Sequence, residues 1–444
     1  MTNTLKERLN MNSVRKLFTD GIKLTKEDFK VGFEYERLPV CKETKTSALY
    51  NGLDGVCEFL RLYARNENWD YLLDEENIIG LKKLHDTITL EPGMQMELSL
   101  EPQKTIQEIE QKVKDIDKSL IPLMNDFDME LLNYGISPIS LYNSIKLLPK
   151  RRYKIMANYL WGILSDVMMR ETAGIQACFD FDSEDDAMKK FRVANMLSPF
   201  ATAMFANSPI RGGVETGYKT FRALSWLNTD TERCGFATNF SKDFCFEDYI
   251  NLVFETPVIM IQRESRTYAV NGTMTLKQFI NGEIQGQTAT LDDFKICANL
   301  YFPDVRLRKF VEIRNHDCVG NNLQYAMLAF YKGIMYSKTA LEDVENIFEK
   351  CKYKDFADLR YNIPKYAMEA DFKKTKVKAI AKELVNISEQ GLKSQNTDEE
   401  KYLEPLQDLV YQGKCPADII LENWNGCWNH DINKLIEYTR ACKF

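Results

Sequence analysis

The segment EPGMQMELSLE, residues 91–101, constrains the fold more than any other part of this 444-residue chain. From residue 94 onward, methionines and leucines alternate with polar residues. Such a period of two is typical of a β-strand that packs one face on a core and leaves the other face polar. The segment therefore predicts a strand, and its polar face carries Gln95, Glu97, Ser99 and Glu101.

Three further segments alternate in the same way. Residues 31–40 place Glu34 and Glu36 on one face, and residues 174–182 place Gln176 opposite a row of apolar residues. In residues 307–318, the expected polar face carries Glu312, Arg314 and His316. If these strands are neighbours, their acids and arginine line one face of a single sheet. For Glu34 and Glu36 taken alone, an exposed edge strand is the alternative.

Two neighbouring carboxylates on one strand repel each other unless a cation neutralises them or their pKa values rise. Mg²⁺ suits such a group because it is a hard cation that prefers oxygen ligands. Arginines beside the acids would neutralise the charge that develops during phosphoryl transfer. The shared face therefore predicts a site for a metal-bound nucleotide.

A glycine-rich stretch, residues 208–230, nearly spells a phosphate-binding P-loop, but Tyr218 intervenes before the lysine, and we reject a Walker-type loop. We interpret the stretch and its neighbourhood as a flexible loop that grips carboxylates and phosphates, with ordinary surface chemistry as the alternative. The basic run at residues 150–152 is interpreted as a solvated segment. The loop cluster consists of Arg211, Lys219, Arg222 and Arg233 with Trp226.

The formal net charge of -7 argues against a general nucleic-acid binder. No run is long and apolar enough for a membrane span, and the N-terminus lacks the apolar core of a secretory signal. The 11 cysteines form no CxxC pair, and 3 histidines give no metal-binding spacing, so we expect reduced thiols and no zinc site. These features predict a cytosolic protein without nucleic-acid or membrane partners, either a monomer or a homodimer.

The remaining pattern predicts helices over residues 48–67, 105–129, 158–168 and from an N-cap at Ser183 toward Pro209. A strongly apolar run at 252–265 predicts a central strand, followed by a short helix at 275–282. No linker interrupts the chain, so we expect one catalytic domain over 1–444. Its sheet-bearing core would span 1–320, and 321–444 would form a mainly helical part of the same domain.

Several long motifs together resemble the plant and proteobacterial type of glutamate–cysteine ligase, whose catalytic sheet is related to that of glutamine synthetase. The resemblance implies an α+β fold with a largely antiparallel twisted sheet, a polar active-site face and helices on the other face. The chain departs from it at Met94, where the family has a second glycine, and after Arg314. The motifs are GFEYER (32–37), EPGMQMELS (91–99), MRETAGIQACFDFDSE (169–184), KKFRVANMLSPFATAMFANSP (189–209), FRALSWLNTDTERCG (221–235), FPDVRLRKFVEIRNHD (302–317) and EYTRACKF (437–444).

The resemblance also implies roles for individual residues. The metal-binding acids would be Glu34, Glu36, Glu97 and Glu312, holding two or more Mg²⁺ ions, with Mn²⁺ as the alternative. Arg222 and Trp226 would contact glutamate, with Arg170 and Thr172 lining the same cavity. Arg314 and Arg233 would be catalytic and would bind the phosphates of ATP together with Gln95.

The implied reaction is ATP-dependent ligation of the γ-carboxylate of glutamate to the amine of cysteine, through a γ-glutamyl phosphate. It yields γ-glutamylcysteine, ADP and phosphate, the first step of glutathione-type thiol synthesis. The alternatives are a ligase with another amine acceptor, a guanidino-type kinase of the same superfamily, and a catalytically inactive binding protein.

Overall fold

The structure is a computed structural model that describes residues 9–264, 266–284 and 286–441. The start of the polar lead-in, the last residue of the 252–265 run and the end of the EYTRACKF motif lie outside these ranges. Within them, we find no helix with the length and apolarity that crossing a membrane would require.

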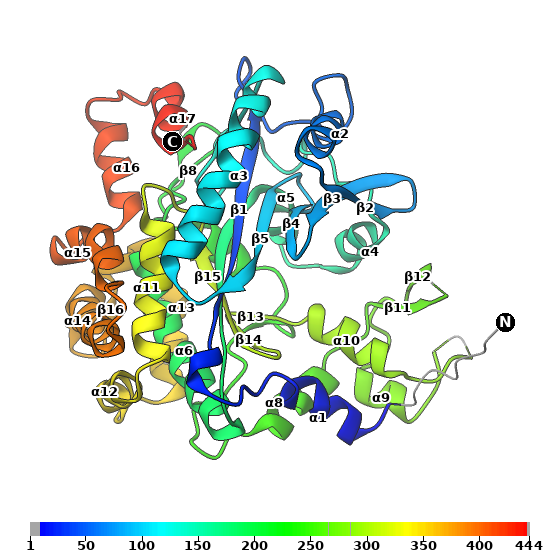
Figure 1. Ribbon diagram of the computed structural model, residues 1–444, viewed down its shortest axis with the longest axis vertical. Helices are drawn as coiled ribbons and strands as arrows, with labels where there is room; N and C mark the ends of the chain where they lie inside the picture. The colour runs from blue at the N-terminus through cyan, green and yellow to red at the C-terminus, as the bar shows by residue number, and fades with distance from the viewer. Residues whose placement is uncertain (1–8, 265, 285, 442–444) are drawn as a thin grey trace.

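A sheet of nine strands forms the centre of the described part of the chain (Figure 1). The strands pair antiparallel in the order β14-β15-β7-β1-β5-β4-β3-β2, and β6 pairs with the second half of β1. The predicted α+β class and antiparallel sheet are thus confirmed. The strands are β1 (Val31–Cys41), β2 (Asp70–Asp74), β3 (Asn77–Lys83), β4 (Asp86–Leu90), β5 (Met96–Gln103), β6 (Met129–Leu132), β7 (Gly174–Phe179), β14 (Val305–Leu307) and β15 (Val311–Asp317).

Helices cover the apolar face of the sheet (Figure 1). Helix α6 (Glu184–Met204) packs on β15, and α11 (Leu323–Met335) packs on β7 and β1. The predicted N-cap of α6 is confirmed, because the Ser183 side chain accepts a hydrogen bond from the Asp186 backbone N–H. Most of α6 is buried all round, since a second helical layer covers its outer side: α12 (Lys338–Phe348), α13 (Tyr353–Tyr366) and α14 (Val377–Gln395).

A smaller group of elements lies at the lower right of Figure 1 and includes the run predicted as a central strand. That prediction is wrong. The run begins in a helix, and its strand pairs with a neighbour in a separate hairpin rather than in the main sheet. A short apolar run is equally compatible with the buried end of a helix and with a strand. The group comprises α1 (Met11–Thr19), α8 (Phe246–Phe254), β11 (Met260–Arg263), β12 (Arg266–Ala269), α9 (Leu276–Ile280) and α10 (Leu291–Asn299).

The other elements connect these layers. The helix predicted over 105–129 is confirmed: Thr105 and Glu108 form a capping box at its start. The helix predicted over 158–168 is replaced by two shorter ones, α4 (Arg151–Tyr159) and α5 (Ser165–Glu171). The helices are α2 (Val56–Glu67), α3 (Ile106–Asp126), α4 (Arg151–Tyr159), α5 (Ser165–Glu171), α7 (Phe221–Leu227), α15 (Glu404–Tyr411), α16 (Pro416–Asn425) and α17 (Ile432–Thr439), with 3-10 turns at Lys26–Asp28, Ala367–Glu369 and Glu400–Leu403. The short strands are β8 (Ile210–Arg211), β9 (Val214–Glu215), β10 (Cys234–Gly235), β13 (Phe302–Pro303), β16 (Asp371–Phe372) and β17 (Thr375–Lys376).

Strand β15 contains an irregularity that changes one predicted residue. Its register with β7 shifts between Ile313 and His316, so His316 pairs with Ile175 on the apolar side of the sheet. The prediction that His316 shares a face with Glu312 is therefore wrong. The imidazole is fully buried, and its Nε2 lies 3.2 Å from the Tyr331 hydroxyl. A bulge of this kind reverses the alternation beyond it.

Candidate functional site

The four predicted acids lie on one face of the sheet. Glu36 is directly opposite Glu97 across the β1–β5 pair, and Glu34 is opposite Gln176 across the β1–β7 pair. Glu312 on β15 is opposite Cys178, two residues along β7 from Gln176. Residues paired in this way project from the same face. The adjacency that the sequence left open is therefore present.

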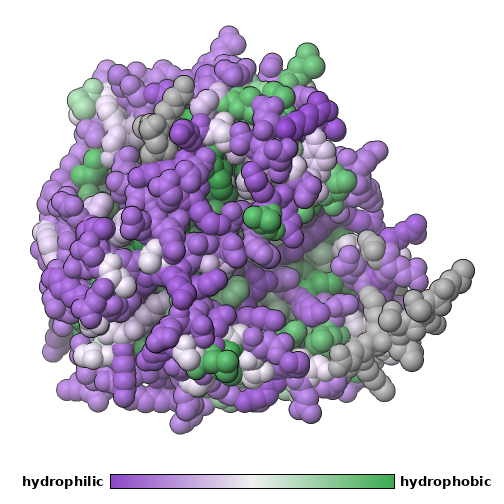
Figure 2. Space-filling view, viewed as in Figure 1, coloured by the Kyte–Doolittle hydropathy of each residue, from purple (hydrophilic) through white to green (hydrophobic). Residues whose placement is uncertain are grey.

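These acids form the floor of a cavity of about 320 Å³. In the space-filling view, the molecule is hollowed between the region of α4 and that of α10 (Figure 2). The wall is built by residues before and within α4, by α5, by α7 and by the strand pair β14–β15. Nine of the eleven predicted site residues line the cavity: Glu34, Glu36, Gln95, Glu97, Thr172, Arg222, Trp226, Glu312 and Arg314.

The acids on β1 and β5 repel one another. Burial and the charge of Glu312 raise the pKa of Glu34 to about 7. Burial, helped by Glu34 and Glu91, raises the pKa of Glu97 well above its ordinary value. The Glu97 carboxylate accepts hydrogen bonds from the hydroxyls of Thr89 and Ser99 at 3.1 and 3.2 Å, but no positive side chain bonds it among the described residues. This side of the floor has an unbalanced negative charge.

The charge of Glu36 is balanced in part by its neighbours. Its carboxylate accepts hydrogen bonds from the Gly174 backbone N–H at 2.5 Å and from Gln176 Nε2 at 3.2 Å. Burial raises its pKa, although the nearby Arg222 opposes the shift. The charge of Glu36 is thus shared between backbone, amide and guanidinium groups.

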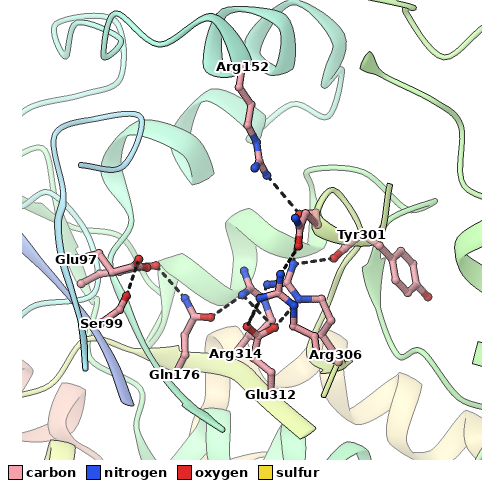
Figure 3. A network of polar contacts seen from close by, with 11 residues as sticks. Glu97, Ser99, Arg152, Gln176, Tyr301, Arg306, Glu312 and Arg314 are labelled. Carbon is pink, nitrogen blue, oxygen red and sulfur yellow. Dashed lines mark hydrogen bonds and ion pairs between the residues drawn. The ribbon is translucent and has the colours of Figure 1, made fainter. Parts of the chain in front are cut away.

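Glu312 is held by arginines (Figure 3). Arg306, its cross-strand partner, donates to both carboxylate oxygens, and Arg308 and Arg314 lie 3.5 and 3.6 Å away. Burial alone would raise the pKa of Glu312, but Arg306 and Arg314 lower it to about 2. Arg314 also donates to Gln176 Oε1 at 2.5 Å, which links this cluster to the acids of β1.

Arg222 and Trp226 enter the cavity from α7, one helical turn apart. The predicted flexible loop is a helix at this point, capped by Thr220, whose side chain accepts from the Ala223 N–H. The Arg222 guanidinium carbon lies 5.9 Å from the Trp226 ring centre, and its Nη2 donates to the Arg314 carbonyl. Arg222 Nε and Trp226 Nε1 are buried without a hydrogen-bond partner among the described residues. Both donors are therefore unsatisfied within the described chain.

Arg233 does not reach the cavity. Its guanidinium is fully buried, pairs with Asp230 at 3.1 Å and donates to the carbonyls of Leu300 and Pro257. Arg170 also faces elsewhere, pairing with Asp166 at 3.0 Å and donating to the carbonyls of residues 142 and 145. The geometry therefore corrects the phosphate role of Arg233 and the substrate role of Arg170, since neither lines the cavity.

The rest of the predicted basic cluster is also engaged outside the cavity. Arg211 forms a two-bond ion pair with the buried Glu171, and Lys219 pairs with Asp418 at 2.7 Å. These contacts hold loops in place. Of the cluster around residues 208–230, only Arg222 and Trp226 contribute to the cavity.

Gln95 lines the cavity but its amide is committed to the backbone. Its Oε1 accepts from the Gly93 N–H at 2.7 Å, and its Nε2 donates to the carbonyls of Met169 and Thr172 at 3.1 and 2.8 Å. The side chain therefore ties the 91–95 turn to the end of α5. Both amide hydrogens are thus used within the chain, and one lone pair of Oε1 remains for the expected contact with the nucleotide.

Five charged lining residues were missed from the sequence. The basic run at 150–152 was interpreted as solvated, but Lys150 and Arg152 face the cavity, and only Arg151 is exposed. Glu91 accepts a hydrogen bond from the Tyr153 hydroxyl at 3.2 Å, beside Lys150. The alternation in VRLRKF, residues 305–310, could have pointed to Arg306 and Arg308. The five are Glu91, Lys150, Arg152, Arg306 and Arg308.

Comparisons with known proteins show which family the chain resembles over most of its length. The family model described as glutamate-cysteine ligase family 2 matches residues 30–438. The chloroplastic glutamate–cysteine ligase of Nicotiana tabacum is 30% identical over 419 residues, which cover 93% of this chain and 80% of that protein. The chloroplastic enzyme of Arabidopsis thaliana is 29% identical over 419 residues, with 93% and 80% covered.

Two solved structures share the fold. One is a glutamate–cysteine ligase from Francisella tularensis in complex with AMP, at 14% identity and a TM-score of 0.57, covering 94% of this chain and 89% of that one. The other is a bifunctional glutathione synthetase from Pasteurella multocida, at 9% identity and a TM-score of 0.55, covering 93% and 52%.

Proposed function

The chain belongs to glutamate–cysteine ligase family 2, the enzymes that form γ-glutamylcysteine with ATP, and we propose that the cavity above the sheet is where this chain performs that reaction. The observation that carries the proposal is the division of the cavity floor. Unbalanced carboxylates lie on β1 and β5, and arginines gather around β14 and β15. A ligase of this type needs a place for cations and a place for phosphates side by side.

Glutamate would bind through Arg222 and Trp226. The unpartnered Arg222 Nε and Trp226 Nε1 are buried donors, and a carboxylate is the acceptor that a guanidinium binds best. Thr172 lines the same wall, but its hydroxyl donates to the Met168 carbonyl and shapes the wall rather than supplying a free donor. The substrate's α-carboxylate at this wall would leave its γ-carboxylate pointing toward the floor.

Magnesium would be held by Glu34, Glu36, Glu97 and Glu312. The donor set fits, because it consists of carboxylate oxygens and because burial, with the neighbouring acids, raises the pKa values of Glu34 and Glu97, so their ionised forms need a cation beside them. When bound, Mg²⁺ supplies positive charge to the phosphate oxygens of ATP. Glu312, already paired with Arg306, would contribute its remaining lone pairs and join the two regions.

Arg306, Arg308 and Arg314 would bind the phosphates, joined by Arg152 from the opposite wall. Arg152 Nε is buried without a partner among the described residues, and its Nη2 makes only a 3.4 Å contact to the Asn299 carbonyl. We propose that these guanidiniums stabilise the charge on the γ-phosphoryl group as it moves to the glutamate γ-carboxylate. The product of this step would be a γ-glutamyl phosphate.

The amine acceptor must lose a proton before it attacks, and we propose that Glu91 takes it. Glu91 is not one of the four acids assigned to the cation, and it accepts a hydrogen bond from Tyr153 beside Lys150. Transfer of one ammonium proton to Glu91 frees the nitrogen lone pair. The C–N bond then forms as the C–O bond to phosphate breaks, and the second proton leaves with solvent.

The test is phosphate release from ATP with Mg²⁺ and glutamate across a panel of amines, with products identified by mass. We expect release with cysteine and formation of γ-glutamylcysteine, and loss of both in Glu97→Ala. Glu101→Ala is the matched control, since Glu101 lies on β5 and does not line the cavity. Wild-type rates in Glu97→Ala, or no release with any amine, would contradict the proposal.

We also propose one catalytic domain, in the cytosol, as a monomer or homodimer. One hydrophobic cluster reaching from residue 9 to residue 441 supports the single domain. The ten cysteines within the described ranges are all free, which suits a reducing compartment. The plant relatives are named as chloroplastic, so microscopy of a tagged full chain would test the compartment.

A further inference from the structure

A buried thiol lies beside two acids of the cavity floor, although its own residue does not line the cavity. Cys178 on β7 is directly opposite Glu312 on β15, and its neighbour two residues earlier is opposite Glu34 on β1. The Cys178 Sγ and one carboxylate oxygen each of Glu34 and Glu312 all lie within 4.8 Å of one another. Three strands thus bring two oxygens and one sulfur to one point.

Gly32 on the neighbouring strand leaves space for the Cys178 sulfur beside the two acids. Cys178 is 8% exposed and has no disulfide partner among the described cysteines. On the other neighbouring strand it faces Gly32, where an added Cβ would come within 2.9 Å of Cys178 Cβ and 3.6 Å of Sγ. The glycine leaves the thiol room beside the acids. A larger residue there would have to displace the cysteine side chain.

A mixed set of carboxylate and thiol ligands has a different metal preference from carboxylates alone. Oxygen ligands suit Mg²⁺, whereas sulfur ligands favour softer divalent ions such as Zn²⁺. Zn²⁺ is bound in proteins by cysteine sulfur and by glutamate oxygen in the same site. Glu34 accepts no hydrogen bond from a positive side chain within the described ranges, so its carboxylate oxygens remain open to a cation, while Arg306, Arg308 and Arg314 act on it from nearby.

We propose that Glu34, Cys178 and Glu312 form a binding site for thiophilic divalent cations, in which Zn²⁺ or Co²⁺ competes with Mg²⁺. Binding forms a metal–sulfur bond and releases the thiol proton to solvent. The soft ion would occupy acids that the proposed ligation needs for Mg²⁺, so excess zinc would inhibit the enzyme by exchange at its own cation site. The inference rests on the proposed function only for the shared acids.

Cobalt provides a direct readout, because Co²⁺ bound to a thiolate shows a charge-transfer absorption that oxygen ligation does not. We expect one equivalent of Co²⁺ added to the full chain without substrates to produce this band. It should be absent in Cys178→Ser and Cys178→Ala, and should disappear from the wild type when Mg²⁺ is added in excess. Cys297→Ala is the control, since Cys297 is also a buried cysteine but does not belong to the group of Glu34, Cys178 and Glu312.

A Zn²⁺ titration followed by calorimetry gives the size of the effect. Loss of the sulfur should weaken the tightest Zn²⁺ binding by about tenfold or more, with little change for Mg²⁺. A band that persists in both Cys178 variants, or no band in the wild type, would overturn the proposal. Ligation by the wild type with Mg²⁺ is measured in parallel: ligation without a cobalt band rejects only the thiol, and absence of ligation rejects the proposed function.

Discussion

The two sides of the cavity floor carry the same residue type in opposite electrostatic states. On β15, Glu312 faces three arginines and its pKa falls to about 2. On β1 and β5, burial and then the charges of other acids raise the pKa values of Glu34 and Glu97. One side is neutralised by the chain itself, and the other side is left for a cation from solution. The difference shows that carboxylates in one site can either form ion pairs that stabilise the fold or stay unpaired and bind a ligand, depending on their neighbours.

The largest effect on stability is expected from Glu312→Gln. The change leaves Arg306, which is 7% exposed, without its ion-pair partner, and breaking a buried pair from one side costs about 3–5 kcal/mol. Urea unfolding in the absence of divalent cations measures this loss. The double variant Glu312→Gln, Arg306→Met is the control and should recover part of it. A loss below about 1 kcal/mol would mean that the two sides of the floor do not differ as described.

Glu91→Gln should lower the rate with cysteine by about 100-fold or more, the usual contribution of a positioned general base. Hydroxylamine is an amine that is already unprotonated at neutral pH, so formation of γ-glutamyl hydroxamate should be nearly unchanged. Comparing the two acceptors separates proton transfer from activation of glutamate. Equal losses with both acceptors would place Glu91 with the cation ligands instead.

Arg222→Lys tests the difference between an arginine with free donors and one without. We expect the KM for glutamate to rise about 10- to 100-fold, since a lost hydrogen bond to a charged group costs about 1.5–3 kcal/mol. Arg233→Lys is the matched change in a guanidinium that is bonded to Asp230 and two carbonyls. It should lower the melting temperature and leave the KM unchanged. A raised KM in Arg233→Lys alone would reverse the assignment.

Glu97→Gln should act on stability in the opposite direction to Glu312→Gln. Removing one of several repelling acids is expected to stabilise the chain by about 1 kcal/mol in the absence of divalent cations. Saturating Mg²⁺ should then stabilise the wild type by about 2–3 kcal/mol and the variant by much less. Thermal unfolding with EDTA and with Mg²⁺ measures both changes. A variant that is less stable than the wild type in EDTA would show that Glu97 is already neutralised.

Sequence alone identified the acidic floor because strand alternation fixes which side chains share a face. Once β1, β5, β7 and β15 pair, the faces of Glu34, Glu97 and Glu312 follow without further information. The alternation failed only at His316, where one bulge changes the face. A bulge depends on local pairing that a single sequence does not reveal.

The arginines were harder to assign because their roles depend on contacts distant in sequence. Arg233 belongs to a family motif, yet its guanidinium bonds the carbonyls of Pro257 and Leu300. Lys150 and Arg152 looked solvated, and they reach the cavity because α4 packs beside the 91–95 turn. A long flexible side chain can point toward solvent or inward from the same backbone position. Only the tertiary arrangement decides between these outcomes.

The smallest predicted effect comes from His316. This buried imidazole lies on the other face of the sheet from the acids of the cavity floor, and its pKa is shifted as well. Burial, aided by the charge of Arg222, lowers the pKa of His316 to about 3, so the folded chain keeps the ring neutral. The unfolded chain binds a proton below pH of about 6.5, and stability must therefore fall as the pH drops from there toward 3. The loss reaches about 1.4 kcal/mol per pH unit below that value.

His316→Phe removes this dependence and suits a position between Phe205 and Tyr331. The difference in unfolding free energy between wild type and variant, measured in urea at pH 7.5 and at pH 5.5, should shift by about 1 kcal/mol against the wild type at the lower pH. Every other titrating group contributes to both proteins and cancels. Parallel pH profiles would mean that the imidazole is protonated in the folded chain, and the positive charge beneath the floor would then neutralise part of what we assign to the missing cation.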